Sequence, residues 1–165
     1  MSAQTSKEEI LKRVQQRGGD YVEAVCGNCA QSTIFALEED FGAVKAIPLR
    51  ALTAMSGIAL RGETCGAVVG ALLALGILTG RENEEFREAF PGTMERATRF
   101  CDAFEKELGS LICKHIHTRL FGRVYDLADP VQQQEFLEAG GLTKCRAPVE
   151  TASRLVAEII LGEEA

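Results

Sequence analysis

Apolar residues recur at intervals of three and four along almost the whole chain, with Ala, Leu, Glu and Arg between them. This spacing places apolar side chains on one face of an α-helix, whereas the strict alternation typical of strands is almost absent. Gly, Pro and the capping residues Ser, Thr, Asp and Asn divide the pattern into segments. The sequence therefore predicts an all-α fold, a helical bundle.

The positions of the glycines, prolines and capping residues predict where the helices begin and end. Gly18-Gly19 offers a left-handed stop for the first helix, Asn28 can cap the second, and Pro48 suits the first turn of the third. Thr64 can cap the next helix, which breaks at Gly80. A short helical piece is expected around residues 21–25. The expected helices cover residues 7–16, 28–42, 48–60, 65–80, 81–109 with an interruption at 91–92, 110–120, 129–139 and 148–161.

The segment CGAVVGALLALGILTG, residues 65–80, is the most apolar part of the chain. Its uncharged stretch of about 15 residues is short of the roughly 20 that cross a bilayer. Gly and Ala at helical spacing leave small surfaces that let neighbouring backbones approach closely. We therefore expect no membrane span but a buried Gly/Ala-rich central helix, with Ala67–Leu78 as the most buried segment.

The charge balance and the composition narrow the function. With 24 acidic against 18 basic residues the net charge is −6, and the scattered basic residues form no stripe that could bind nucleic acid. The first ten residues contain no apolar run, so we expect a cytoplasmic protein. No repeat or linker divides residues 1–165, which predicts a single domain. Two histidines cannot supply a convincing Ser/His/Asp set, and Gly66–Gly70 lacks the Lys-Ser/Thr of a phosphate loop, so a hydrolase or transferase is disfavoured.

Six cysteines remain to be explained. In the reducing cytoplasm they indicate metal or redox chemistry before a disulfide framework. Four of them fall at or just before predicted helix starts: Cys29, Cys65, Cys113 and Cys145. Free backbone N–H groups and the helix dipole at such positions favour the thiolate, which predicts lowered thiol pKa values suited to metal ligands or redox nucleophiles. We expect the four sulfurs to converge.

The same residues carry a family resemblance. The stretches GNCAQS (Gly27–Ser32) and GETCGAVVGALLALG (Gly62–Gly76), with the later Cys113 and Cys145, resemble the C_GCAxxG_C_C family of redox-active proteins. The resemblance extends from about Tyr21 to Ala157 and implies that the four cysteines are the functional set. A related domain accompanies an iron–sulfur cluster beside haem in split-Soret cytochromes c. No CxxCH is present here, so covalent haem is not implied.

Of the remaining candidates, Cys26 and His117 have open roles, whereas Cys101 does not. Cys26 forms a CxxC with Cys29, but without a preceding strand a thioredoxin-like site is disfavoured, and Cys26 stays a candidate additional ligand, a resolving thiol or a core residue. His117 lies four residues after Cys113, on the same helical face, and is either an additional ligand or a surface histidine. Cys101 lies between Phe100 and Phe104 in an amphipathic helix, where packing explains it.

Three hypotheses follow. The first is a small electron-transfer protein whose four cysteines hold an iron–sulfur cluster, [2Fe-2S] or [4Fe-4S]. The second is a metal-free thiol–disulfide protein or sensor. The third is a four-cysteine zinc site. Each of the redox hypotheses implies a redox partner protein that the sequence does not identify, and the oligomeric state stays open, a homodimer included.

Overall fold

The computed structural model describes residues 6–82 and 86–162, and helices dominate it, as predicted. Within these ranges no strand occurs, apart from one isolated antiparallel bridge. The α-helices are α1 (Lys7–Tyr21), α2 (Cys29–Leu37), α3 (Gly57–Leu60), α4 (Gly66–Thr79), α5 (Phe86–Leu108), α6 (Cys113–Phe121), α7 (Pro130–Glu138), α8 (Gly141–Lys144) and α9 (Arg146–Ile160). A π-helix, η1 (Val22–Cys26), and two 3₁₀ segments, η2 (Gly42–Ala46) and η3 (Leu49–Leu52), complete the order.

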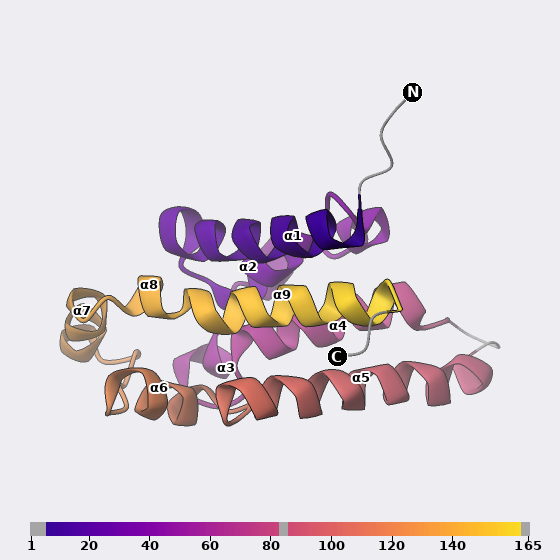
Figure 1. The fold of residues 1–165 in the computed structure, drawn as a ribbon. Coiled ribbons are helices and arrows are strands. Elements are labelled where there is room, and N and C mark those ends of the chain that lie inside the picture. Colours follow the sequence, from indigo (N-terminus) through magenta and orange to yellow (C-terminus); the bar gives the residue numbers. More distant parts are fainter. Residues whose placement is uncertain (1–5, 83–85, 163–165) are drawn as a thin grey trace.

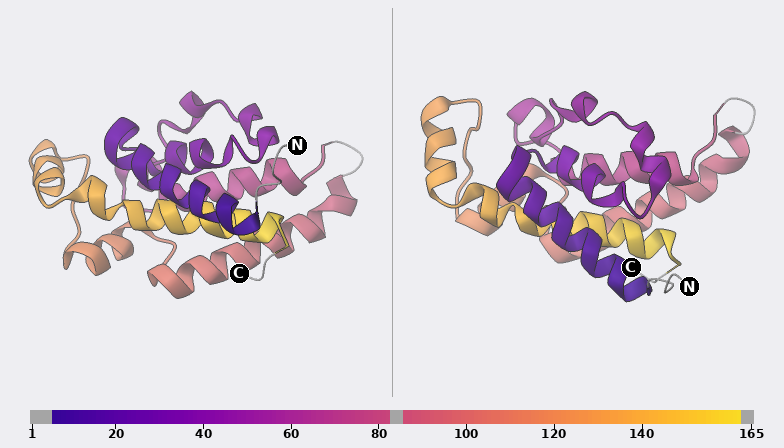
Figure 2. Two further views of the ribbon diagram at one scale, coloured as in Figure 1. Left: turned by 45° about the horizontal axis from the view of Figure 1, so that its top comes forward. Right: turned by 90° about the horizontal axis from the view of Figure 1, so that it is seen from above.

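The long helices lie side by side and share one direction of elongation (Figure 1). Helix α9 runs through the middle, with α1 and α2 on one side and α5 on the other, while α4 packs against α2, α5 and α9. Seen from above, α1 crosses α9 obliquely (Figure 2). The short helices α6, α7 and α8 gather at one end, where α9 begins. No described helix is both long and apolar enough to cross a membrane.

Close helix packing explains where the first predicted helix boundary was wrong. A capping box between Ser6 and Glu9 starts α1, which runs straight through Gly18-Gly19 to Tyr21. Both glycines are buried against α9, and a Cβ on Gly18 would lie 2.9 Å from the Ser153 hydroxyl. The glycines therefore serve close approach between α1 and α9 rather than a helix stop.

The predicted helix over residues 48–60 is also wrong. The chain there forms η3 and then the short turn α3, in which Gly57, Ile58, Ala59 and Leu60 all have positive φ. Right-handed helix cannot contain such residues, because left-handed φ costs free energy for every residue with a Cβ. The spacing of apolar residues predicted a helix here, but the backbone of residues 57–60 is left-handed where Gly57 packs against Cys113.

Smaller corrections concern helix ends. Cys65 rather than Thr64 precedes α4, and α6 begins at Cys113 because Ser110 binds locally to the Ile112 N–H and to His115. Helix α5 continues through Pro91, which is exposed, so its ring needs no space in the core. Helix α8 was not foreseen. Both predicted ends of α7 were right to within a residue, as was the C-terminal end of α9, but α9 begins at Arg146, two residues before the predicted Pro148.

Helix α4 is the Gly/Ala-rich helix of the interior, but it is not the most buried segment. Its residues Leu73 and Ile77 are 41% and 42% exposed on one edge. Over Pro148–Ile159, by contrast, α9 contributes more buried residues than Ala67–Leu78, because α1, α2, α4 and α5 all pack on it. The apolar sequence therefore correctly predicted a helix of the core, but the helix with more buried residues is α9.

Candidate functional site

A cavity of about 360 Å³ opens at the end of the molecule where the short helices gather. Its wall contains five of the six cysteines: Cys26, Cys29, Cys65, Cys113 and Cys145. All of the cysteines are free thiols. Cys101, in α5, lies outside the cavity and is partly buried against the hydrophobic core, which agrees with the packing role predicted for it.

The four cysteines expected at helix starts are found there. Cys29 and Cys113 are the first residues of α2 and α6, and Cys65 and Cys145 immediately precede α4 and α9. Four segments widely separated in sequence thus direct their first turns at one cavity. At the start of α4, the N–H groups of Ala67 and Val68 act on the Cys65 sulfur.

Asn28 fixes the start of α2. Its side-chain oxygen accepts from the Gln31 N–H at 3.0 Å, the N-cap interaction that the sequence predicted. Its amide nitrogen donates to the carbonyls of Leu52 and Thr53, at 3.4 and 3.1 Å. One side chain therefore both begins the helix that carries Cys29 and ties it to the segment of Thr53, another residue that lines the cavity.

Gly66 allows α4 to begin directly against α2. A Cβ on this residue would lie 3.1 Å from the Ala30 nitrogen and 3.3 Å from the Cys29 Cβ. Any larger residue would push the two helix starts apart. The glycine that follows Cys65 is therefore required for Cys29 and Cys65 to share one wall.

Backbone hydrogen bonds hold Cys65 beside Cys113. The Cys65 N–H donates to the Leu111 carbonyl at 2.8 Å, and the Cys113 N–H donates to the Glu63 carbonyl at 2.6 Å. These bonds flank the isolated antiparallel bridge. They join the segments before α4 and α6, which lie far apart in sequence.

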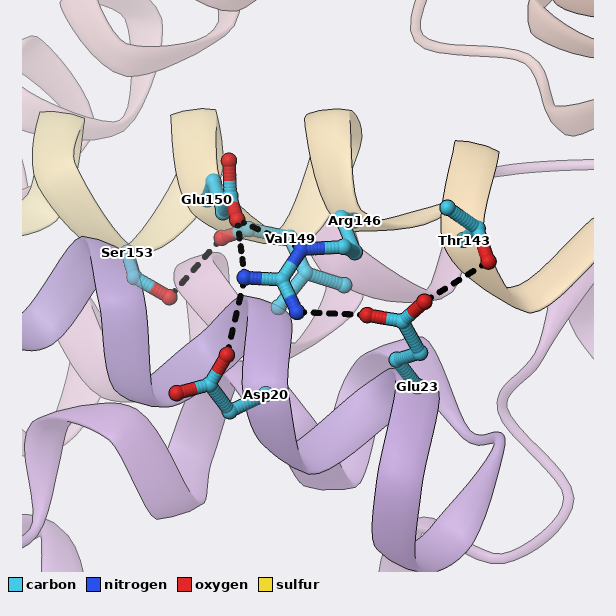
Figure 3. A network of polar contacts seen from close by, with 7 residues as sticks. All are labelled: Asp20, Glu23, Thr143, Arg146, Val149, Glu150 and Ser153. Atoms are coloured by element: carbon cyan, nitrogen blue, oxygen red, sulfur yellow. Dashed lines mark hydrogen bonds and ion pairs between the residues drawn. The ribbon is translucent and has the colours of Figure 1, made fainter.

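A charged network joins η1 to the start of α9 (Figure 3). Arg146 donates to three carboxylates, those of Asp20, Glu23 and Glu150. Glu23 also accepts from the Thr143 hydroxyl at 2.7 Å, and these two contacts hold the pKa of Glu23 below its usual value. Because Arg146 follows Cys145 and η1 ends at Cys26, the network holds these two cysteine-bearing segments together.

Burial decides the protonation of the thiols. A hydrogen bond with Cys145, together with burial, raises the pKa of Cys29 well above its ordinary value. Burial raises the pKa of Cys65 to about 12, although the N–H groups of Ala67 and Val68 act in the opposite direction. Burial also raises the pKa of Cys113, against a hydrogen bond from His117. The predicted net lowering of the pKa was therefore wrong for Cys29, Cys65 and Cys113, because the Cys145 thiol at Cys29, and burial at all three, outweigh the helix starts.

His117 is buried, and not the surface residue that was one of its two predicted roles. It is 4% exposed, and its Nε2 lies 3.7 Å from the Cys113 sulfur. Its ring stacks on Phe136 and meets Phe121 and Tyr125 edge-on. These aromatic rings, which sequence reasoning did not single out, fix the imidazole against Cys113.

Cys26 lies at the cavity wall in a polar setting. Its sulfur accepts from the Asn28 N–H at 3.4 Å and lies 3.3 Å from the Ser32 hydroxyl. These contacts show a thiol that hydrogen-bonds with its own turn, so its predicted roles stay open.

The donor atoms around the cavity decide which metal groups it could hold. In the described ranges, no set of three or more His, Cys, Asp or Glu side chains is arranged to hold a metal ion. The cavity instead distributes soft sulfur donors around its wall, and two buried polar atoms without hydrogen-bond partners, Ser56 Oγ and His117 Nδ1, belong to residues of that wall. Free thiols on one cavity wall are soft donors of the kind that bind zinc or the irons of an iron–sulfur group.

An all-helical fold with a cysteine-lined cavity defines a class of helical thiol proteins, and comparison narrows the class further. The chain matches the family described as "Putative redox-active protein (C_GCAxxG_C_C)" over residues 8–159, so it belongs to that family. Searches of curated proteins and of solved structures found no match.

Proposed function

We propose that this redox-family protein is an electron carrier that holds an iron–sulfur cluster through Cys29, Cys65, Cys113 and Cys145. One observation carries the proposal: four helix-start cysteines, from four separate segments, line a single cavity. Packing residues have no reason to share both a helix position and a cavity.

The buried thiols favour a cationic partner. At neutral pH the raised pKa values keep Cys29, Cys65 and Cys113 protonated in the empty site. Metal ions bind thiolates, so loading exchanges protons for iron, and the positive charge compensates the burial that disfavours the bare anion. Once these thiolates form, the N–H groups at the helix starts stabilise them.

The bound cluster would supply one-electron chemistry. The chain anchors it by four thiolates, and the 3% exposure of Cys65 limits the access of water to that side of the site. His117 would donate from Nε2 to the Cys113 thiolate. A cytoplasmic location and a partner protein that exchanges the electrons are parts of this proposal.

Iron content tests the cluster. After anaerobic isolation and reconstitution with iron and sulfide, we expect a brown parent protein. Cys65→Ser should lose most of the iron, because an alkoxide or hydroxyl replaces a thiolate as one of four anchors. Cys101→Ser is the matched control and should keep the parent's iron, since Cys101 lies outside the cavity. A parent without iron after reconstitution contradicts the proposal, and zinc in its place would indicate a zinc site.

A second candidate rests on two free thiols of the same cavity, Cys29 and Cys145, which lie close enough that Cys145 is the largest cause of the raised pKa of Cys29. In this alternative the two thiols reduce a disulfide supplied by a partner. The disulfide between Cys29 and Cys145 forms as the disulfide of the partner breaks. The two sulfurs of the partner leave as thiols and take up the two protons that Cys29 and Cys145 lose. Metal-free protein treated with a small disulfide should then lose two hydrogens by mass, and Cys145→Ser should abolish this loss while Cys101→Ser does not.

A further inference from the structure

Two side-chain polar atoms in the described part of the chain are buried without a hydrogen-bond partner, Ser56 Oγ and His117 Nδ1. Both residues line the cysteine cavity. Buried polar groups are almost always paired, because an unpaired one has lost water without a replacement. Two such atoms at one cavity indicate that its occupant offers them partners.

Ser56 is the more informative of the two, because nothing in its own turn uses the hydroxyl. It occupies the N-cap position of α3, where a serine ordinarily accepts from the second or third N–H of the helix, but it makes no such bond. Those two donors, on Ile58 and Ala59, already bind the carbonyls of Met55 and Ala54. The hydroxyl therefore has no structural role in α3.

The position of Ser56 among the cysteines is equally specific. Its Cα lies 3.2 Å from the point that a Cβ on Gly66 would occupy, a point that is itself 3.3 Å from the Cys29 Cβ. The next residue, Gly57, approaches Cys113 in the same way, with 3.4 Å between its added Cβ and the sulfur. Ser56 thus lies near Cys29, and Gly57 lies against Cys113.

The backbone around this serine is held in a costly conformation. Gly57 and the three residues after it have positive φ, and β-branched Ile58 is especially disfavoured there. Such strain persists only where surrounding contacts impose it, and it concentrates at functional sites. Here the contacts are those that place residues 56 and 57 against the cysteines.

We propose that the Ser56 hydroxyl donates a hydrogen bond to a sulfur atom of the cluster, cysteine or sulfide, and thereby raises the reduction potential of the cluster. This inference rests on the proposed function. Reduction adds negative charge to the cluster, so a donor aimed at its sulfur stabilises the reduced form more than the oxidised form. Ser56 is a positioning residue that does not bind iron.

His117 acts at a different point of the site. Its Nε2 already contacts the Cys113 sulfur, so its effect passes through that ligand. Its unpaired Nδ1 supports the conclusion that the cavity has an occupant, but does not identify the atom it binds. Ser56 can therefore be tested separately.

The test is a potentiometric titration of the reconstituted protein, with iron content measured in parallel. Ser56→Ala should bind as much iron as the parent and show a more negative midpoint potential. Ser56→Thr keeps the hydroxyl and should keep the parent's potential. Thr53→Ala is the matched control: it removes a hydroxyl from the same cavity wall, but that hydroxyl already donates to the Arg50 carbonyl, so the potential should not change.

The outcomes separate the two proposals. Iron-loaded Ser56→Ala with an unchanged potential overturns the role of Ser56 and leaves the cluster intact. Loss of iron from folded Ser56→Ala also overturns it, because Ser56 would then belong to the ligand set. If Ser56→Ala does not fold, Ser56→Gly removes the same hydroxyl and is judged in the same way: with iron bound, a more negative potential supports the bond and an unchanged potential overturns it. A parent that binds no iron overturns the cluster and the role of Ser56 together.

Discussion

Helices α1, α2, α4 and α9 pack with their backbones in close approach, whereas the end formed by α3, α6, α7 and α8 encloses a cavity. In the packed region, small residues and apolar stripes fill the space between helices. At the cavity end, the chain keeps free thiols, unpaired polar atoms and left-handed residues. The unpaired polar atoms and the left-handed residues lower stability, so packing explains the structure of one region, whereas the other keeps costly features that packing does not require.

The packed region should be intolerant of added volume. A Cβ on Gly70 would lie 2.7 Å from the Ala30 carbonyl oxygen and 3.0 Å from the Thr33 Cβ, so Gly70→Val would force α4 away from α2. We expect this variant to lose about 3 kcal/mol of unfolding free energy in urea denaturation. Gly76→Ala in the same helix is the control, since nothing lies within 4 Å of its added Cβ. It should gain about 1 kcal/mol through helix propensity, and a comparable loss in both variants would contradict the packing argument.

The same contrast explains what the sequence could predict. The spacing of apolar residues identified the helices of the packed region, because the apolar face that each helix buries is visible as a period of three to four residues in the sequence. Helix-start signals such as Asn28 and the glycines placed four cysteines at the starts of α2, α4, α6 and α9, and the structure confirms those positions.

The cavity end was less predictable because its geometry depends on contacts between distant segments. Nothing local in the sequence marks Ser56 as a residue of the cavity wall or Ile58 as left-handed, and their segment packs through Ser56 and Gly57 against Gly66 and Cys113, which are distant in sequence. The direction in which the thiol pKa values shift could not be predicted from the sequence either. Helix position is visible in sequence, but the degree of burial that outweighs it is a property of the folded chain.

An identical substitution in the two regions should have opposite effects. Ile58 in α3 and Ile77 in α4 are similarly exposed, at 37% and 42%, but only Ile58 has positive φ. Ile58→Gly removes left-handed strain and should raise the unfolding free energy by about 1 kcal/mol. Ile77→Gly should lower it by about 1 kcal/mol, because glycine is a poor helix former. Equal losses in thermal or urea unfolding would show that α3 is not strained.

The smallest expected effect concerns the network that joins the two regions, and it should depend on pH. Thr143 and Arg146 lower the pKa of Glu23 in the folded protein. Glu23 therefore stabilises the fold above the ordinary glutamate pKa of about 4.3, and this contribution is lost as the pH falls from that value through the lowered folded pKa. Parent and Glu23→Gln should accordingly differ in urea midpoint at pH 7 and converge toward pH 3. The Arg146→Met background provides the control, because removing one of the two partners should shrink both the difference and its pH dependence. The same pH dependence in both backgrounds would mean that Arg146 does not set the pKa of Glu23, and that the network in Figure 3 does not hold η1 to α9 through this charge.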